Sequence, residues 1–466
     1  MDVAAKRYGT PRFLALLSIA VALCTARSTR AQHQHDGREP NAEEASKISE
    51  TEQQAHPGMD QMGMNHVGVG YAGLMKGPLG LSRSRMGSGT SWLPDSSPMY
   101  GLMAPLGEGG FMFHENVFAG YDWFGSDRGS TQFISLNSIM GMAWHPLGPG
   151  ELLARVMLSA EPATVGKRGY PLILQSGETA NGESLHDRQH AHDFFMEVAL
   201  QYTLVVKDAV AVELYVAPAG EPALGPTAYP HRVSAISDPL APIGHHWQDS
   251  THIAFGVLTA GIFTHRLKLE GSWFNGREPD ESRWDFDLRK PDSYSGRFTW
   301  NPNDDLSFQG SYGYLASPER QDASISVHRV TASATYNLAR HEQTNWATTF
   351  AFGENVQSEG PATPSFLLES NCNLDGHSVI FGRAEYVRKT GHDLVLPPEF
   401  EDSVSGVGLL GLGYAYYFGP FASLAPGLGV RGSAGLVDST LEPIYGTRVP
   451  LGVMLFAQLR PAAMAM

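Results

Sequence analysis

The feature that most constrains the fold of this chain is an alternation of apolar and polar residues with a period of two, which begins near Gly110. In residues 306–314, one face carries Leu, Phe, Gly, Tyr and Tyr, and the other carries Ser, Gln, Ser and Gly. Residues 194–204 follow the same rule. Successive side chains of a β-strand point to opposite faces, so the alternation predicts strands that separate two different environments.

Turn residues separate about sixteen such segments. Short connections alternate with longer loops, of which residues 161–192 and 218–249 are the longest. Short turns at one end and long loops at the other are typical of outer-membrane barrels. A soluble β-sandwich or propeller is the alternative, but neither explains the alternation in loop length. The strands are predicted near residues 110–123, 131–144, 151–160, 193–206, 209–217, 250–264, 266–275, 294–301, 305–315, 325–338, 343–354, 364–371, 377–388, 405–418, 425–437 and 450–460.

A membrane sheet of this kind must close on itself, because lipid offers no hydrogen-bond partner to the backbone. Each tilted strand needs about 9–11 residues to cross a bilayer, which is close to the length of the segments. The predicted fold class is therefore an all-β transmembrane antiparallel barrel of about sixteen strands, with a disordered N-terminal leader. An even number of strands places both termini on the periplasmic side, where the turns are short.

Composition and the N-terminal region agree with an exported membrane protein. Only 17% of the residues are charged, and the net charge of -15 argues against a nucleic-acid partner. Residues 1–31 combine a basic start, an apolar core and a small-residue cleavage site, which predicts a signal peptide. We expect the mature chain to lie in the cell outer membrane of a Gram-negative bacterium, with outer-membrane lipid as a partner. The sequence does not indicate an oligomeric state.

The chain divides into three predicted parts. Residues 1–31 form the signal peptide, and residues 32–108 form a periplasmic leader that carries His and Met and continues into a tether or partial plug. Residues 109–460 form the barrel.

Four motifs give the sequence a family resemblance. They are GYPLILQSGE at residues 169–178, LHDRQHAHD at residues 185–193, SDPLAPIGHHWQDSTH at residues 237–252 and FNGREPD at residues 274–280. With them, most of the barrel region resembles an uncharacterised family of porin-like bacterial outer-membrane proteins. The resemblance implies a barrel and an outer-membrane address, and it implies no activity. The leader segment HPGMDQMGMNH at residues 56–66 is weakly similar to the Met/His leaders of outer-membrane copper-resistance proteins.

Two groups of residues are candidate metal ligands. Imidazole and carboxylate groups suit Zn, Cu or Ni, and thioethers select Cu(I). The alternatives are that the loop histidines fix a folded loop by hydrogen bonds and that the leader is a flexible tether. The candidates are His56, Met59, Met62, Met64 and His66 in the leader, and His186, His190, His192, His245, His246 and His252 in the two longest loops.

Charged residues on the polar faces are candidates for a selectivity lining. Opposed rows of charge would filter solutes by size and sign, and the long loops are candidates to constrict the lumen. The alternative is mutual neutralisation inside a plugged barrel. These residues are Arg155, Glu161, Glu197, Lys268, Glu270, Arg297, Arg329, Arg383, Glu385 and Arg431.

Methionine is frequent on three consecutive predicted strands. The alternation places Met112, His114 and Met157 on the polar face, where thioethers would favour Cu(I). It places Met140 and Met142 on the opposite face, where we expect them to pack against lipid.

These observations favour an outer-membrane channel or transport component for small or ionic solutes. The alternative is a protein that handles copper or another metal ion through the leader and the His-rich loops. An enzyme at the outer rim ranks third, because no nucleophile elbow, phosphate-binding loop or zinc-protease motif is present. We therefore expect no enzymatic activity, and no cofactor beyond copper or another divalent metal.

Overall fold

The computed structural model describes residues 73–249, 253–319, 323–341 and 344–464. The predictions for the signal peptide and for most of the leader therefore lie outside the described residues.

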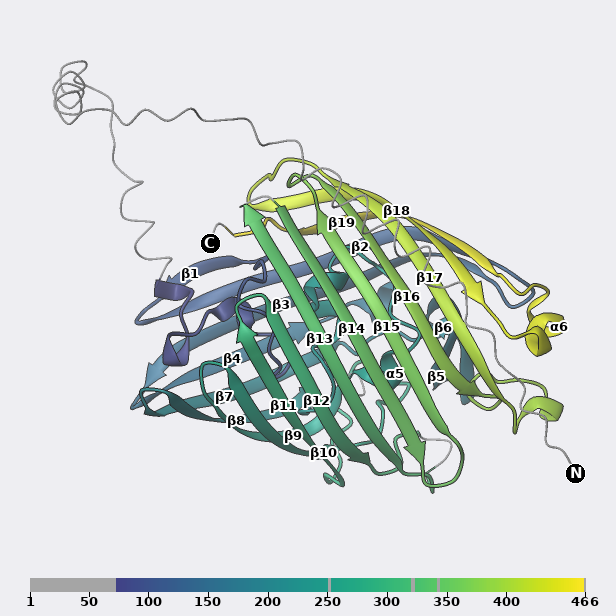
Figure 1. The fold of residues 1–466 in the computed structure, drawn as a ribbon, viewed down its shortest axis with the longest axis horizontal. Helices are drawn as coiled ribbons and strands as arrows, with labels where there is room; N and C mark the ends of the chain where they lie inside the picture. Colours follow the sequence, from purple (N-terminus) through teal and green to yellow (C-terminus); the bar gives the residue numbers. More distant parts are fainter. Residues whose placement is uncertain (1–72, 250–252, 320–322, 342–343, 465–466) are drawn as a thin grey trace, which may run out of the picture. The chain divides into compact units, whose positions relative to one another are not determined.

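Sixteen antiparallel strands form one closed sheet, because each strand pairs with the next and β19 pairs with β2 (Figure 1). All sixteen predicted strands occur in the predicted order, which confirms the fold class. The strands are β2 (Gly109–Gly125), β3 (Thr131–Leu147), β4 (Gly150–Leu158), β7 (Phe195–Lys207), β8 (Val210–Gly220), β9 (Ala254–Phe263), β10 (Leu267–Asn275), β11 (Ser293–Asn303), β12 (Leu306–Leu315), β13 (Val327–His341), β14 (Thr344–Gln357), β15 (Ala362–Asn373), β16 (Ser378–Thr390), β17 (Val404–Tyr417), β18 (Leu424–Leu436) and β19 (Leu451–Pro461).

Three further strands were not predicted. Strand β1 (Leu102–Leu106) pairs with the start of β2, on the edge that β19 leaves uncovered. Strands β5 (Tyr170–Ala180) and β6 (Glu183–Gln189) form a separate two-stranded sheet. The hairpin lies within the long connection between β4 and β7, which the sequence analysis treated as a loop.

The helices of the described chain are short. None of them has the length and apolar character needed to cross a bilayer. They are η1 (Pro78–Gly80), η2 (Arg83–Arg85), α4 (Glu161–Thr164), η3 (Tyr229–His231), η4 (Val233–Ala235), α5 (His245–Gln248), η5 (Pro398–Phe400), η6 (Ser439–Leu441) and α6 (Glu442–Tyr445).

Strand β10 shows how the two faces of the wall differ. Leu267 and Leu269 are 44% and 58% exposed on the outer face, whereas Lys268 and Glu270 are 2% and 3% exposed on the inner face. Burying charge while exposing large apolar side chains is unfavourable in water, but it is the arrangement of a barrel wall that faces hydrocarbon. The predicted alternation thus corresponds to an apolar outer face and a polar inner face.

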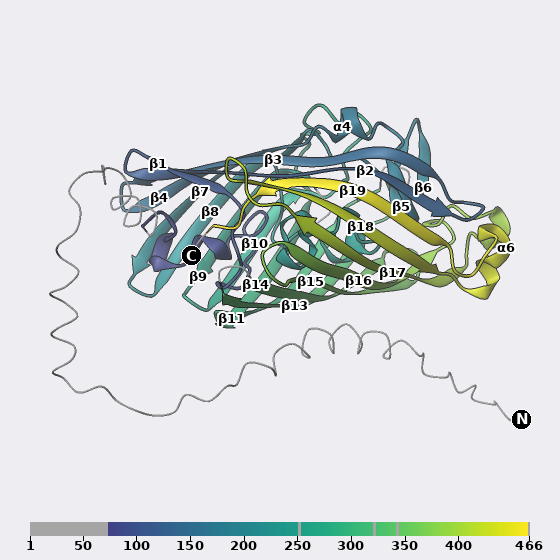
Figure 2. The ribbon, with the colours of Figure 1, turned by 90° about the horizontal axis from the view of Figure 1, so that it is seen from above.

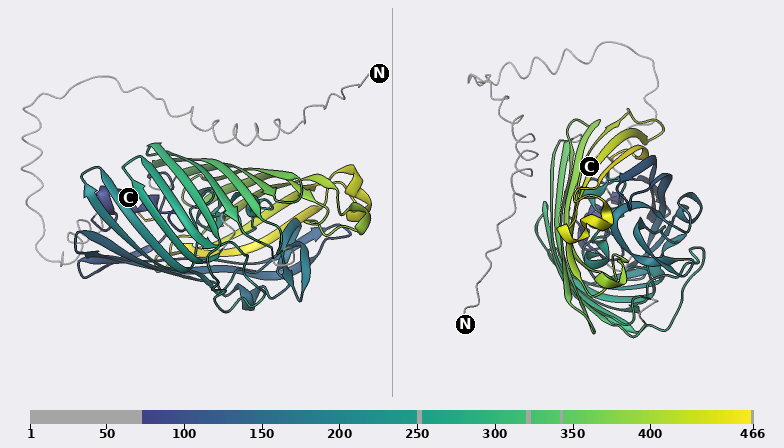
Figure 3. Two further views of the ribbon diagram at one scale, coloured as in Figure 1. Left: turned by 90° about the horizontal axis from the view of Figure 1, so that it is seen from below. Right: turned by 90° about the vertical axis from the view of Figure 1, so that its right-hand side faces the viewer.

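The interior is filled by three segments of the chain rather than by side chains of the wall alone (Figures 2 and 3). One segment, residues 82–97, accepts hydrogen bonds from the wall: Lys268 Nζ donates to Thr90 O at 2.6 Å, and Asn301 Nδ2 donates to Leu93 O at 2.9 Å. The second segment is the β5–β6 hairpin. The third is the connection between β8 and β9, residues 221–249, which we call the inward loop.

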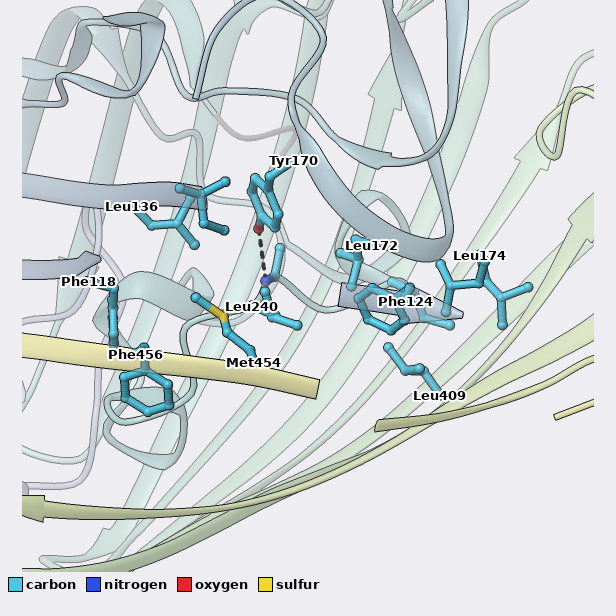
Figure 4. Packing of buried hydrophobic residues seen from close by; sticks show 14 of the residues in the cluster. Phe118, Phe124, Leu136, Tyr170, Leu172, Leu174, Leu240, Leu409, Met454 and Phe456 are labelled. Atoms are coloured by element: carbon cyan, nitrogen blue, oxygen red, sulfur yellow. Dashed lines mark hydrogen bonds between the residues drawn. The ribbon is translucent and has the colours of Figure 1, made fainter. Parts of the chain in front are cut away.

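The β5–β6 hairpin packs against the inner face of the wall (Figure 4). Leu172 and Leu174 of β5 lie in one apolar cluster with Phe124 of β2. The hydroxyl of Tyr170 accepts a 3.1 Å hydrogen bond from the backbone N–H of Ala241, which ties the hairpin to the inward loop.

Buried ion pairs fix the inward loop to the opposite wall. Arg232 of the loop contacts Glu369 of β15 at 2.6 Å and Asp249 at 2.9 Å, and Arg383 of β16 contacts the same Glu369 at 3.0 Å. Each of these side chains is at most 3% exposed. Removing one member of such a network leaves an uncompensated buried charge, so the loop is a fixed part of the interior.

The prediction that Met140 and Met142 face lipid is wrong. Both are 3% exposed and point inward, on the same face as Ile134, whereas Phe133 and Ile139 point outward. The physical reason is that the interior is apolar at this height, since the segments that fill it bring apolar side chains against β3.

Candidate metal centre

Three histidines from the two long connections meet inside the barrel. His190 follows β6, and His245 and His246 begin α5. One ring nitrogen of each lies within 4.8 Å of the ring nitrogens of the other two. The three residues are between 1% and 7% exposed. We call this group the imidazole centre.

Two glycines allow α5 to lie so close to its neighbours. Gly177 of β5 has φ +110°, and a Cβ there would stand 2.8 Å from Cε1 of His246. A Cβ on Gly353 of β14 would stand 2.0 Å from the carbonyl oxygen of Trp247. The hairpin and the wall can approach α5 only because neither position carries a side chain.

Carboxylates hold two of the three rings. Nε2 of His190 lies 3.2 Å from Oε1 of Glu178, and Nδ1 of His246 lies 3.0 Å from Oε1 of Glu278. Arg283 contacts Glu178 in turn and also lies 3.3 Å from Asp193. A carboxylate on a ligating imidazole fixes the ring orientation and raises its basicity. Nδ1 of His190 lies 2.9 Å from the carbonyl oxygen of Ala191, so a metal at this ring would replace one of its two protein contacts.

An amide holds the third ring, and a carboxylate and a hydroxyl hold the ring of a neighbouring histidine. Nε2 of His245 lies 2.9 Å from Oε1 of Gln189. His192 lies beside the centre with its ring centroid 6.4 Å from that of His190. Its Nδ1 lies 2.9 Å from Glu161, and its Nε2 lies 3.2 Å from the hydroxyl of Tyr229.

Burial sets the charge state of these rings. It lowers the pKa of His190 and of His245 well below the usual value, and the neighbouring His246 adds to the effect. Burial also opposes the charged form of His192, but the Glu161 carboxylate outweighs it and raises the pKa of that ring. Only a neutral imidazole offers a lone pair to a metal, so His190 and His245 have the protonation state that a ligand requires.

The predicted loop histidines divide into two groups. His190, His245 and His246 meet at the centre, and His192 lies next to it. The side chain of His186 is 44% exposed on β6 and contacts Asp187 at 3.0 Å. His252 and the five leader candidates, His56, Met59, Met62, Met64 and His66, lie outside the described residues.

The ten charged residues proposed for a selectivity lining are all inside the barrel. Each is at most 5% exposed, and Glu161 lies on α4 rather than on the wall. Their partners are one another, other charged residues of the wall and the interior segments: Lys268 contacts Glu213 of β8 at 2.6 Å, and Arg297 contacts Glu270 at 3.0 Å. The others are Arg155, Glu197, Arg329, Arg383, Glu385 and Arg431.

Of the groups that hold the rings, only Glu161 was a candidate from the sequence, as part of the selectivity lining. Glu178, Gln189 and Glu278 stand within or next to the quoted motifs, and a carboxylate near a His-rich motif was the one indication of such a role. The sequence does not show which histidine each of them contacts. Tyr229 and Arg283 lie outside the motifs, so nothing in the sequence pointed to them.

No protein-family model and no curated protein matches this chain. Solved outer-membrane proteins are similar in fold. OmpT of Vibrio cholerae shares 7% identity over 77% of this chain and 100% of its own, with a TM-score of 0.43. The anion-selective porin of Comamonas acidovorans shares 12% identity over 77% and 100%, with a TM-score of 0.46. OmpF of Salmonella typhi shares 11% identity over the same shares, with a TM-score of 0.48. Sequence identities and TM-scores this low do not indicate a solute for this chain.

Proposed function

We propose that this chain is an outer-membrane barrel that handles a divalent transition-metal ion, bound at the imidazole centre. The observation that carries the proposal is the convergence of His190, His245 and His246, with ring nitrogens within 4.8 Å of one another. Imidazole ligands suit Zn, Cu and Ni. Three of them leave a fourth coordination position on the metal for a carboxylate, a water or another ligand.

Two properties of the surroundings support this function. The carboxylates of Glu178 and Glu278 contact the rings, and they would offset part of the charge of a bound cation. The apolar outer face supports an address in the outer membrane, where a metal-handling barrel would meet ions from outside the cell.

The proposal is tested by metal binding to the folded full-length barrel. The protein is stripped with a chelator in detergent and titrated with Zn(II) against a chromophoric competitor, and with Co(II) to follow ligand-field absorption. A companion chain with the leader candidates His56, Met59, Met62, Met64 and His66 changed to Ala isolates the barrel. We expect one tight site in that companion chain, and the proposal fails if it binds no metal more tightly than the competitor does.

The charge of Glu278 is expected to matter for affinity. Glu278→Gln should weaken Zn(II) binding by about 10- to 100-fold, because the amide keeps the shape of the partner of His246 but not its charge. Glu359→Gln is the matched control, since Glu359 is exposed in the connection after β14. An equal affinity of the two variants would show that the carboxylate does not support a ligand.

A second candidate function is a channel for small ionic solutes. The charged inner face favours it, because rows of buried Arg, Lys and Glu side chains lie along the wall. Steady conductance of the intact chain in planar bilayers, with a preference for one sign of ion, is the result that would favour this candidate over the first.

A further inference from the structure

A second group of soft ligands lines an internal cavity away from the imidazole centre. The cavity has a volume of about 100 Å³ and lies between the start of β2, β3, β4 and the inward loop. Two histidines reach it, His114 from β2 and His231 from η3. Six methionines complete this part of the lining: Met86, Met99, Met112, Met140, Met142 and Met157.

The two imidazoles face each other across this space. Their ring centroids are 6.1 Å apart, with an interplanar angle of 66°. Nε2 of His114 is buried and has no hydrogen-bond partner among the described residues. A buried imidazole nitrogen without a partner is costly in an apolar surrounding, so its presence here calls for a ligand.

Methionine gathers here beyond what packing alone requires. Seven buried and three partly buried methionines belong to one apolar cluster, out of sixteen in the chain. Leu or Ile would fill a core equally well and with better-defined rotamers, whereas Met adds a polarisable thioether. The six that line the cavity come from the wall and from the segment before β1.

We propose that this cavity is a binding site for a soft monovalent cation with a filled d shell, Cu(I) or Ag(I). The ligands would be thioether sulfurs and an imidazole of His114 or His231. Thioethers select such cations, whereas Mg²⁺ and Ca²⁺ need several oxygen ligands. Glu115 is the one carboxylate among the lining residues. The inference goes beyond the imidazole centre and does not depend on it, because the ligands differ in chemistry.

Three residues of this lining also reach a second, smaller cavity. Met157, Pro230 and His231 line a neighbouring cavity of about 30 Å³ as well. That second cavity is lined further on by His192 and Tyr229, which lie beside the imidazole centre.

The test uses the full-length barrel with the leader candidates changed to Ala. Cu(I) affinity is measured anaerobically by competition with a chromophoric Cu(I) chelator, and Ag(I) binding is measured by calorimetry. Met112→Leu/Met157→Leu should weaken both by about tenfold or more, since two thioethers are lost while side-chain volume is kept. Met103→Leu/Met454→Leu is the matched control, because these methionines are buried but do not line the cavity.

Two further results decide the proposal. X-ray absorption of the Cu(I)-loaded companion chain should show sulfur scatterers, and a spectrum with nitrogen and oxygen neighbours only would overturn the inference, whether or not the variants fold. Equal Cu(I) affinity of the two double variants would also overturn it. The Met112→Leu/Met157→Leu variant should keep the Zn(II) affinity of the parent chain, so failure of the imidazole centre and failure of this site are distinguishable.

Discussion

Replacing His246 by Ala is expected to lower the Zn(II) affinity of the folded barrel by about 100-fold or more, because the variant keeps only two imidazoles. It also leaves Glu278 without the ring that it contacts at 3.0 Å. His190→Ala should have an effect of the same size, since His190 is the one ligand that the connection between β4 and β7 supplies to the imidazole centre. The measurement is the same Zn(II) competition, made on the chain that lacks the leader ligands.

The matched control is His186→Ala. His186 is in the same motif as His190, but its ring is exposed and lies outside the imidazole centre. We expect it to bind Zn(II) with the affinity of the parent chain. If His186→Ala and His246→Ala lose affinity equally, the loss comes from a disturbed loop and not from a missing ligand. Each variant must first show the heat-modifiable migration of a folded barrel.

Shortening the inward loop is expected to open the barrel. Replacing residues 222–249 by a short Gly/Ser linker removes Arg232 and its partner Asp249 together, so no single loop charge is left behind. The wall should still close, since β19 pairs with β2 through backbone hydrogen bonds that the loop does not supply. The segment of residues 82–97 and the β5–β6 hairpin stay in place, but a sixteen-strand wall that loses one of its three filling segments has room for an aqueous path, so we expect a rise in single-channel conductance.

The control for this experiment is a chain that lacks residues 32–72, a deletion that removes none of the residues that the structure describes. Its conductance should equal that of the parent chain. If shortening the inward loop leaves conductance unchanged in a correctly folded barrel, then this loop does not obstruct the lumen.

Much of the wall could be predicted because its signal is local. The alternation of Leu267, Lys268, Leu269 and Glu270 fixes which side chains face lipid without reference to any other strand. Strand β1 escaped prediction because its segment is rich in Gly and Pro and has no alternation of its own. Strand β1 pairs with the first residues of β2, whose edge is free because β19 pairs only with the later residues of that strand.

The interior was harder to predict, since its contacts are far apart in the sequence. Arg232 and Glu369 are separated by 137 positions, and nothing near either residue indicates the other. The lipid-facing assignment of Met140 and Met142 failed for a related reason. Alternation shows that two faces differ, but not which face is inner where the interior itself is apolar.

The candidate site was predicted in part. The motifs located His190, His245 and His246, but His186 was grouped with them because the β5–β6 hairpin was not recognised. On β6, the period-two alternation turns Asp187 and Gln189 inward and His186 outward. A hairpin that folds inside a barrel has no sequence signature that separates it from a surface loop of the same length.

The most direct test of the imidazole centre is anomalous diffraction from crystals of the chain grown with Zn(II) or Co(II), with data collected on both sides of the metal absorption edge. We predict an anomalous peak within bonding distance of His190, His245 and His246, inside the barrel. Anomalous peaks confined to surface carboxylates or to the leader, with these three rings bonded only to their protein partners, would contradict it.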